Sequence, residues 1–120
     1  MIERRKGCII SVSSGLSKRP GQGFKAHSAA KAALNMLSNS LAQEVAQFGI
    51  RVNVVAPGLT LTDATAGQLE ERKKASAASN PMRRLGRPEY LAGAILFLES
   101  DCAKYINSGY LSVDGGTTIL

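Results

Sequence analysis

The sequence predicts an α/β fold with a parallel sheet, and two observations lead to this prediction. Three apolar runs typical of buried strands, CIISVS at 8–13, IRVNVVA at 50–56 and GYLSV at 109–113, alternate with segments of helical periodicity. Strands joined through helices become parallel neighbours by right-handed crossovers. Because 120 residues suffice for one modest core, we expect a single unit over 1–120.

The first strand and the first helix are predicted from their boundaries as well as from their periodicity. Gly7 and the SSG sequence at 13–15 bound the first apolar run, and a loop rich in Gly, Pro and Lys follows it. Between 28 and 48, apolar residues recur at three- and four-residue spacing, as on one face of a helix. Gly49 stands where the C-terminal cap of that helix is expected.

The second half of the chain is predicted to hold two further helices and the last strand. The PG dipeptide at 57–58 ends the second strand, and the polar segment after it is expected to be mobile, with a charged helix over 64–76 capped by Thr62 or Asp63. A turn-rich linker then leads to a helix over 89–98 and to the strand that ends in VDGG. No element is predicted beyond the first strand, so we expect one bare sheet edge.

Composition narrows the functional classes. The net charge is +6, but aromatic residues make up only 5% of the chain and do not interleave with the basic clusters, so we expect no nucleic-acid partner. No apolar stretch is long enough for a membrane span, so we expect no membrane partner. Cys8 and Cys102 lie far apart in a chain without a secretory signal, which favours reduced thiols and a cytoplasmic protein. We assign no metal ligands.

Five segments resemble a known family. They are GCIISVSSG, HSAAKAAL, SLAQEVAQFGIRVNVVAPGLTLTD, PMRRLGRPEYLAGAILFLESDCAKYINSG and VDGG, in the order and spacing of the C-terminal half of a short-chain dehydrogenase/reductase. The resemblance covers nearly the whole chain and implies a partial Rossmann-type, doubly wound parallel sheet. The family's glycine-rich dinucleotide-binding loop has no counterpart here. We therefore expect the N-terminal half to be absent, and the chain to be a fragment, a truncated reading frame or half of a split enzyme.

The resemblance implies a catalytic set. Ser14 matches the serine that holds the substrate oxygen, thirteen residues before the general-acid position, and Ser13 is the runner-up. Lys31 matches the lysine that bonds the nicotinamide ribose and lowers the pKa of the family's general acid. His27 stands where the family has its catalytic tyrosine.

The resemblance also implies contacts with the cofactor, NAD(P)(H), with NADP(H) preferred. Pro57 and Gly58 match the turn that flanks the nicotinamide. The backbone of Thr60 matches the group that holds the carboxamide, and Thr62 matches a pyrophosphate contact. Because the pyrophosphate-binding helix N-terminus of the missing half is required for tight binding, we expect this chain alone to bind the cofactor weakly or not at all.

His27 has three competing interpretations. Residues four apart share a helix face, so His27 and Lys31 are expected to face one ligand. Histidine ordinarily has a pKa of about 6.5 against about 10 for tyrosine, and it is shorter. In the first interpretation, His27 is a weaker acid in the ordinary carbonyl-reductase mechanism. In the second, it indicates the enoyl- and dienoyl-CoA reductase branch, where this tyrosine is commonly missing. In the third, it is a loop-edge residue of a protein without catalysis.

These features predict an NAD(P)(H)-dependent short-chain oxidoreductase of the 3-oxoacyl or carbonyl reductase type. The alternatives are an enoyl- or dienoyl-CoA reductase-like enzyme and an inactive fragment that serves as an interaction module. We expect a small-molecule or acyl-thioester substrate, covered by the segment 61–80 as a lid. The resemblance implies a homodimer or homotetramer built partly on the Ala-rich helix and the last strand.

Overall fold

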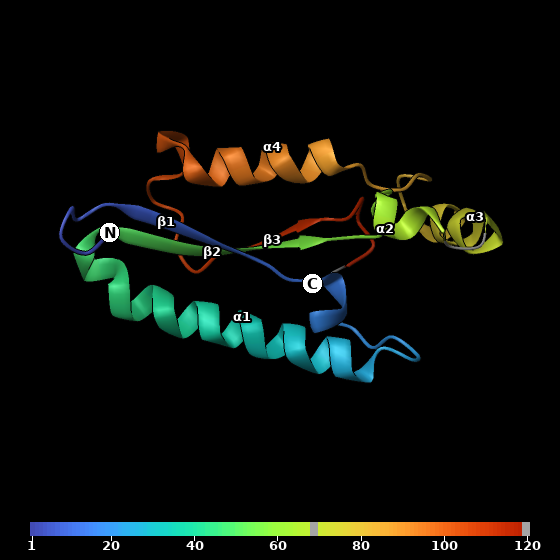
Figure 1. Cartoon of the computed structure of the whole chain (residues 1–120), viewed down its shortest axis with the longest axis horizontal. Helices are drawn as coiled ribbons and strands as arrows, with labels where there is room; N and C mark the ends of the chain where they lie inside the picture. Colours follow the sequence, from blue (N-terminus) through green and yellow to red (C-terminus); the bar gives the residue numbers. More distant parts are fainter. Residues whose placement is uncertain (68–69, 119–120) are drawn as a thin grey trace.

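The computed structural model describes residues 1–67 and 70–118 and arranges them in three layers (Figure 1). A sheet lies in the middle, α1 (Lys25–Val45) covers one of its faces and α4 (Pro88–Glu99) covers the other. This architecture confirms the predicted α/β class.

The sheet has three parallel strands, as predicted. β1 (Gly7–Val12), β2 (Ile50–Pro57) and β3 (Tyr110–Val113) lie in the order β1-β2-β3, so β2 is central. The side chains of Val52 and Val55 are fully buried, although neighbouring positions in β2 point to opposite faces of the sheet. A strand covered on both faces needs apolar residues on both, which explains the apolar run at 54–56.

α1 is longer at its start than its apolar periodicity indicated. It begins at Lys25 rather than at residue 28, and after Val45 the chain tightens into η2 (Ala46–Phe48), a 3₁₀ turn. Gly49 has φ of 69°, in the left-handed region that glycine adopts without strain. The predicted cap at Gly49 is confirmed.

The second long helix and the last strand lie as predicted. α4 begins with Pro88 at its first position, where the missing N–H costs nothing. After η3 (Asp101–Ala103), the chain turns into β3 through Ser108, which has φ of 58°. Ser108 donates its backbone N–H to Val52 O at 2.8 Å and its hydroxyl to Asn39 at 3.0 Å, and these bonds hold the unusual backbone.

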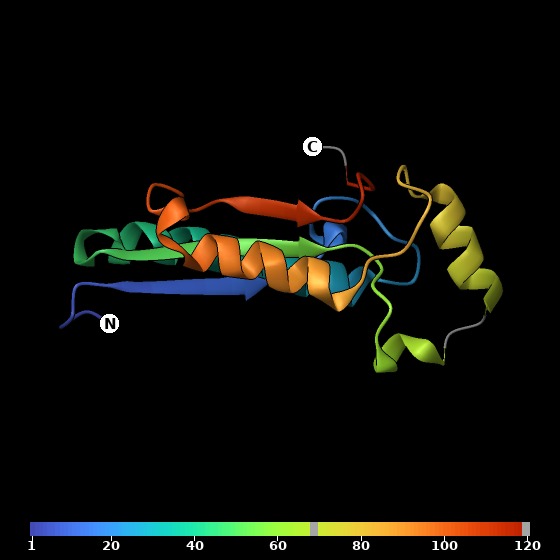
Figure 2. The ribbon, with the colours of Figure 1, turned by 90° about the horizontal axis from the view of Figure 1, so that it is seen from above.

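The segment after β2 departs from the prediction. A single helix over 64–76 is wrong, because α2 (Asp63–Ala66) is one turn long and α3 (Glu70–Ser79) is a separate helix. Gly67 follows α2, and glycine costs about 1 kcal/mol in a helix interior relative to alanine, which explains the break. Thr62 caps α2 through a reciprocal capping box, in agreement with one of the two predicted caps. Both helices lie beyond the carboxyl ends of the strands (Figures 1 and 2).

The outer edge of β1 pairs with no strand in the described part of the chain, as expected (Figure 2). Ser13 N–H points inward to Val55 O at 2.8 Å. Since backbone groups of successive residues point to opposite sides of a strand, those of Val12 point outward. Lys31 Nζ donates to Val12 O at 2.7 Å, so a side chain rather than a strand satisfies this carbonyl group.

Both covering helices expose apolar side chains on their outer faces. The exposed residues are Met36 and Leu37 on α1 and Leu96 and Phe97 on α4, and each is more than two-fifths exposed. No helix among the described residues is long and apolar enough to cross a membrane.

Candidate active site

A cavity of about 370 Å³ lies at the carboxyl ends of β1 and β2. Ser14 follows β1, Pro57 and Gly58 lie at the end of β2, and α3 contributes Arg72 and Ser76 to the lining. Open parallel sheets bind ligands at the carboxyl ends of their strands, and small-molecule sites have volumes of this order. The cavity brings together Ser14, Pro57 and Gly58 of the predicted site residues.

Ser14 is better placed than Ser13 for contact with a ligand. Ser14 caps η1 (Gly15–Ser17), and its Oγ accepts the backbone N–H of Leu16 at 3.2 Å. This bond uses a lone pair, so the hydroxyl proton remains free to be donated into the cavity. Ser13 is only 4% exposed, and its Oγ donates to the carbonyl oxygen of Lys31 at 3.3 Å. Ser13 therefore links β1 to α1 and does not line the cavity.

A hydrogen-bond network that the sequence analysis missed holds the turn after Ser14. Tyr110 on β3 donates its hydroxyl to Ser14 O at 3.0 Å and lies 3.2 Å from Ser17 Oγ. Ser17 Oγ donates to Ser14 O at 2.6 Å and accepts from Asn35 Nδ2 of α1 at 2.8 Å. The ammonium of Lys18 lies 4.3 Å from the centre of the Tyr110 ring. The network joins residues from three elements, so the serine is fixed from both the sheet and the helix.

His27 and Lys31 lie one turn apart on α1, as their spacing predicted, but neither lines the cavity. His27 is exposed, and its ring stands edge-on to Phe24 with 6.3 Å between ring centroids. Lys31 is half-buried, and its ammonium is held by the outward-facing carbonyl group of Val12. Both side chains lie at the N-terminal end of α1, the helix that follows the Ser14 turn.

Gly58 is required where β2 approaches the end of β3. A Cβ built on Gly58 would lie 2.8 Å from Cβ of Asp114, closer than such atoms pack. Asp114 is buried, and its carboxylate accepts the backbone N–H groups of Gly116 at 3.0 Å and Thr118 at 2.8 Å. The carboxylate of Asp114 therefore stabilises the turn at residues 114–118 through these two hydrogen bonds.

Thr60 and Thr62 lie on the connection from β2 to α2, outside the cavity lining. Thr60 forms an isolated parallel bridge with Gly86, and its hydroxyl donates to Gly58 O at 3.0 Å. The carbonyl oxygen of Thr60 accepts the hydroxyl of Thr65 at 2.8 Å. These bonds fix the base of the segment that carries α2 and α3.

The cavity fits a nicotinamide ring, which carries an amide and needs polar partners. Ser14 offers a hydroxyl proton, and Thr118 Oγ1 is buried in the lining without a hydrogen-bond partner among residues 1–67 and 70–118. A buried hydroxyl without a partner is uncommon in native proteins and indicates a place for a ligand atom. Within the same ranges, no group of three or more His, Cys, Asp and Glu side chains could hold a metal ion.

The outer wall of the cavity is positively charged. Arg19 and Arg72 both line it, and neither has an ion-pair partner among the described residues. On the exposed side of α3, Glu70 pairs with Lys73 at 2.9 Å, and this hydrogen bond is the main cause of a lowered pKa of the Glu70 carboxyl.

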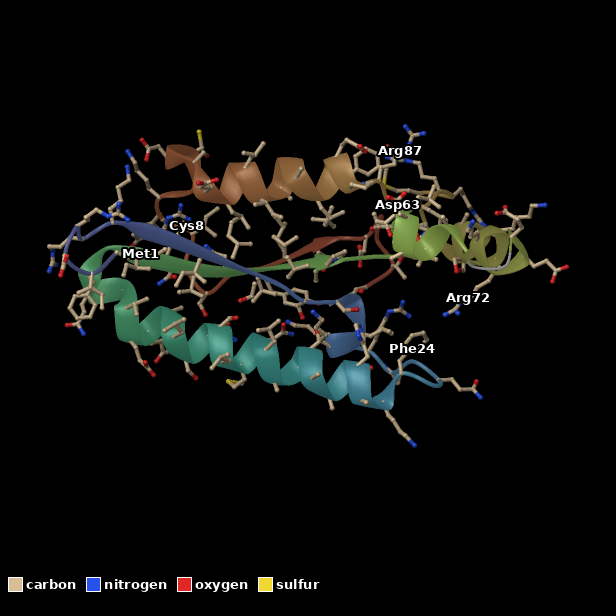
Figure 3. All side chains as sticks on the ribbon, viewed as in Figure 1. Met1, Cys8, Phe24, Asp63, Arg72 and Arg87 are labelled. Atoms are coloured by element: carbon tan, nitrogen blue, oxygen red, sulfur yellow. The ribbon has the colours of Figure 1, made fainter. Side chains whose placement is uncertain are left out.

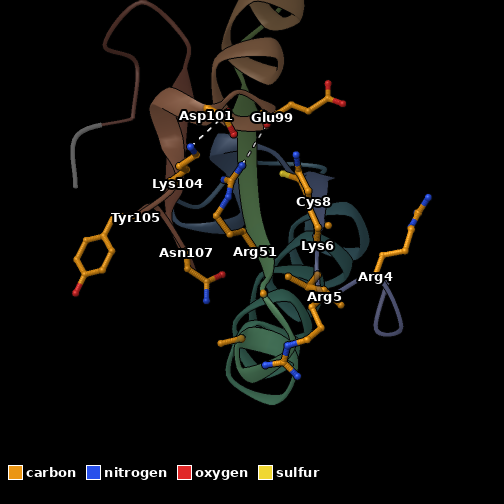
Figure 4. Close-up of a pocket in the computed structure, with 14 residues that line it drawn as sticks. Arg4, Arg5, Lys6, Cys8, Arg51, Glu99, Asp101, Lys104, Tyr105 and Asn107 are labelled. Carbon is orange, nitrogen blue, oxygen red and sulfur yellow. Dashed lines mark hydrogen bonds and ion pairs between the residues drawn. The ribbon is translucent and has the colours of Figure 1, made fainter.

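A larger hollow of about 1070 Å³ lies at the opposite, amino ends of β1 and β2 (Figure 4). Some of its charged side chains have partners: Arg5 donates to Gln47 O at 2.6 Å, Arg51 donates to Glu99 O at 3.3 Å, and Lys104 pairs with Asp101 at 3.4 Å. We place the candidate active site in the smaller cavity, because it lies at the ligand-binding end of a parallel sheet and contains the buried hydroxyl of Thr118, which has no partner among the described residues.

Comparisons with known proteins show which family the chain matches. The family model described as enoyl-(acyl carrier protein) reductase matches residues 1–118. The chain is 42% identical over 116 residues to the 3-oxoacyl-[acyl-carrier-protein] reductase FabG of Chlamydia trachomatis, a match that covers 97% of this chain and 47% of that protein. It is 44% identical over 115 residues to a 3alpha-hydroxysteroid dehydrogenase of Mediterraneibacter gnavus, covering 96% of this chain and 46% of that protein.

A solved structure shares the fold over the whole chain. The crystal structure of a 3-oxoacyl-[acyl-carrier protein] reductase from Brucella melitensis with bound NAD superposes with a TM-score of 0.91 at 30% identity, covering 100% of this chain and 44% of that one. The chain therefore spans about half the length of the proteins it matches. The predicted Rossmann-type fold is confirmed.

Proposed function

The chain belongs to the short-chain dehydrogenase/reductase family, and we propose that it is the C-terminal half of an NAD(P)(H)-dependent oxidoreductase of the 3-oxoacyl or carbonyl reductase type. The observation that carries this proposal is the cavity at the carboxyl ends of the strands, where Ser14 meets the Pro57–Gly58 turn. The dinucleotide-binding half of the fold would be supplied by residues outside these 120. This division agrees with the half-length coverage of the relatives.

The residues of the chain have separate tasks in the proposed reaction. When bound, NAD(P)(H) supplies or accepts the hydride. Ser14 donates a hydrogen bond to the substrate oxygen and stabilises the negative charge that develops there, a kind of contact worth about 10²–10³ in rate. Lys31 binds the ribose hydroxyls of the cofactor. To do so, its ammonium has to release the carbonyl oxygen of Val12, to which it donates in this structure. His27 gives the oxygen its proton, directly or through a water molecule.

We propose that Pro57 and Gly58 flank the nicotinamide, that the backbone of Thr60 holds its carboxamide, and that Thr62 contacts the pyrophosphate. Pro57 and Gly58 line the cavity, which supports the first of these roles. Thr60 and Thr62 lie on the connection that follows Gly58, outside the cavity lining, so they would contact a ligand only at the rim of the cavity. We further propose a preference for NADP(H) and a cytoplasmic protein.

The proposed protein assembles through its exposed apolar helix faces. Met36 and Leu37 are each 64% exposed on α1, although long apolar side chains are ordinarily covered. We propose that a second copy covers this face in a homodimer or homotetramer, with β3 contributing to the contact.

A second reaction is supported by one observation. The matching family model is described as an enoyl reductase, and the resemblance implies that His27 stands in the place of the catalytic tyrosine. In an enoyl- or dienoyl-CoA reductase-like enzyme, the hydride would be added to an activated double bond, and the proton would not need to come from residue 27.

The test is NAD(P)H consumption by the natural polypeptide that carries this chain. We expect turnover of acetoacetyl-pantetheine and no turnover of crotonyl-pantetheine, with His27→Tyr faster and His27→Ala slower than the natural protein. Turnover of crotonyl-pantetheine alone, unaffected by His27→Ala, would establish the enoyl reductase instead. No turnover of either compound by the natural protein or by His27→Tyr would favour the interaction module.

The isolated chain has its own test. We expect calorimetry to detect NADPH binding only at millimolar concentrations or not at all, because the pyrophosphate-binding helix N-terminus is not among its residues. Micromolar binding would contradict the proposed division of the fold.

A further inference from the structure

We propose that the cavity takes a carbonyl substrate that carries an anionic group, a carboxylate or a phosphate, and that Arg19 and Arg72 bind this group. The inference rests on the proposed function and adds the substrate class. It starts from the position of the two arginines in the same cavity as Ser14.

Arg19 and Arg72 approach the cavity from two separate elements. Arg19 lies in the loop between η1 and α1, and Arg72 lies in the first turn of α3. Neither guanidinium donates a hydrogen bond to a described residue, and neither has an ion-pair partner in that part of the chain. Guanidinium groups present several donors in a planar fork that matches carboxylate and phosphate oxygens.

Three other arginines of the chain donate to backbone carbonyl groups outside this cavity. Arg5 and Arg51 donate to backbone carbonyl groups at the amino end of the sheet, and Arg83 donates to the carbonyl oxygen of Ala78. Arg84 stacks over the Tyr90 ring at 4.8 Å. Arg19 and Arg72 are set apart by their position, because they are the arginines of the cavity lining and neither donates to a described residue.

Phe24 holds Arg72 in position without occupying the N–H donors of the Arg72 guanidinium. The guanidinium carbon of Arg72 lies 5.7 Å from the centre of the Phe24 ring, and Figure 3 shows the two side chains meeting from α3 and from the loop before α1. A cation above an aromatic face leaves the N–H groups at its edge available. The contact also brings the helix α3 against the opposite rim of the cavity.

No negative charge in the lining competes for the two arginines. Asp114 is the acidic residue of the lining, and its carboxylate oxygens accept the N–H groups of Gly116 and Thr118. The hydroxyl of Thr118 has no partner among the described residues and is a further donor for an oxygen atom in the cavity. An anionic group would thus meet two guanidinium groups, one hydroxyl donor and no unpaired carboxylate in the described lining.

The test compares substrates that differ only in charge. With the natural polypeptide that carries this chain, kcat/KM for 5-oxohexanoate should exceed that for 5-oxohexanamide by at least about tenfold, the effect of one good charged hydrogen bond. A second pair, acetoacetyl-phosphopantetheine and acetoacetyl-pantetheine, shows whether the anion is a phosphate of the carrier rather than a carboxylate. A preference in either pair supports the proposal, and equal values in both pairs overturn it.

Variants identify the residues responsible. Arg19→Gln with Arg72→Gln should bring the preferred ratio close to one, and Arg72→Lys should keep part of it. Arg87→Gln removes the same charge from an exposed side chain that does not line the cavity, so the ratio should stay unchanged. A ratio that survives the double substitution, or falls equally with Arg87→Gln, contradicts the assignment.

A measurement of ligand binding without turnover tests the anion site independently of the proposed reductase function. If none of the compounds is reduced, the reductase function fails, and saturation-transfer NMR still tests the anion site. A signal from 5-oxohexanoate that exceeds that of the amide and disappears in the double variant supports the site. Equal signals from the two compounds, or a signal unchanged in the double variant, overturn it.

Discussion

The two ends of the sheet carry hollows of different size and different chemistry. At the amino end, a hollow of about 1070 Å³ is bordered by charged side chains, of which Arg5 and Arg51 bond to backbone carbonyl groups and Lys104 pairs with Asp101. At the carboxyl end, a cavity of about 370 Å³ holds Ser14, Arg19 and Arg72, whose side chains donate to no described residue. The difference teaches that position at the carboxyl ends of parallel strands, rather than volume, distinguishes a ligand site from a gap between elements.

The largest expected effect is at Ser14. Ser14→Ala removes the donor to the substrate oxygen and should lower kcat about 10²–10³-fold in the natural protein. Steady-state NAD(P)H consumption measures it. Ser13→Ala is the matched control: it removes a buried hydroxyl that bonds to Lys31, so it should cost about 1 kcal/mol of stability and change kcat only a few fold. Equal losses of kcat in the two variants would remove the distinction between these serines.

Gly58 tests how closely the carboxyl end is packed. Gly58→Ala places a Cβ 2.8 Å from Cβ of Asp114 and should destabilise the fold by about 1–3 kcal/mol, measured by urea unfolding. Gly67→Ala is the control, because an added Cβ there meets nothing within 4 Å. It should be neutral or slightly stabilising. A neutral Gly58→Ala would show that the turn is loose.

Tyr110 tests whether the network behind Ser14 positions it. Tyr110→Phe removes the hydrogen bond to Ser14 O and should cost about 1 kcal/mol of stability. It should also lower kcat while leaving KM nearly unchanged, because the phenol contacts the turn and not the substrate. Tyr105→Phe, at a fully exposed ring, should change neither quantity. A purely structural role would lower stability at an unchanged kcat.

Arg51 tests the amino end. Arg51→Gln shortens a side chain that donates to Ile106 O at 3.4 Å and to Glu99 O at 3.3 Å. These long bonds predict a loss of stability of about 1 kcal/mol at most and an unchanged kcat/KM. A substantial fall in kcat/KM would mean that the larger hollow takes part in the reaction.

The smallest effect is at Glu70 on α3. Its pKa is lowered by the hydrogen bond from Lys73, so the pair stabilises the fold above the ordinary pKa of a glutamate and loses this contribution as the pH falls through the lowered value. Glu70→Gln should therefore be slightly less stable than the natural protein near neutral pH and equal to it in acid. Urea unfolding at several pH values measures the difference, which is small because the carboxylate of Glu70 is exposed to solvent. A difference that grows toward acid would contradict this sign.

The sequence predicted the elements well where local patterns determine them. The run at 54–56 is apolar because β2 is covered on both faces, and Gly49 is a glycine because the backbone there is left-handed. The helix over 64–76 was wrong because a single glycine interrupts a pattern that is otherwise polar throughout and has no core face to fix its length.

The site was predicted only in part. The distance from Ser14 to the following helix indicated the serine, but the support from Tyr110 joins residues 96 positions apart and has no local signal. The position of Arg19 and Arg72 in one cavity likewise becomes visible only in the folded chain, because the two residues lie far apart in the sequence. Contacts of this kind depend on how the elements pack, and no periodicity encodes them.

The most direct test is the position of the nicotinamide ring in a crystal structure of the natural polypeptide that carries this chain, grown with NADPH and separately with NADH. The account predicts the ring against Pro57 and Gly58, with the hydroxyl of Ser14 facing the reacting carbon from across the cavity. A ring bound at the amino end of the sheet, among Arg5, Arg51 and Lys104, would contradict it.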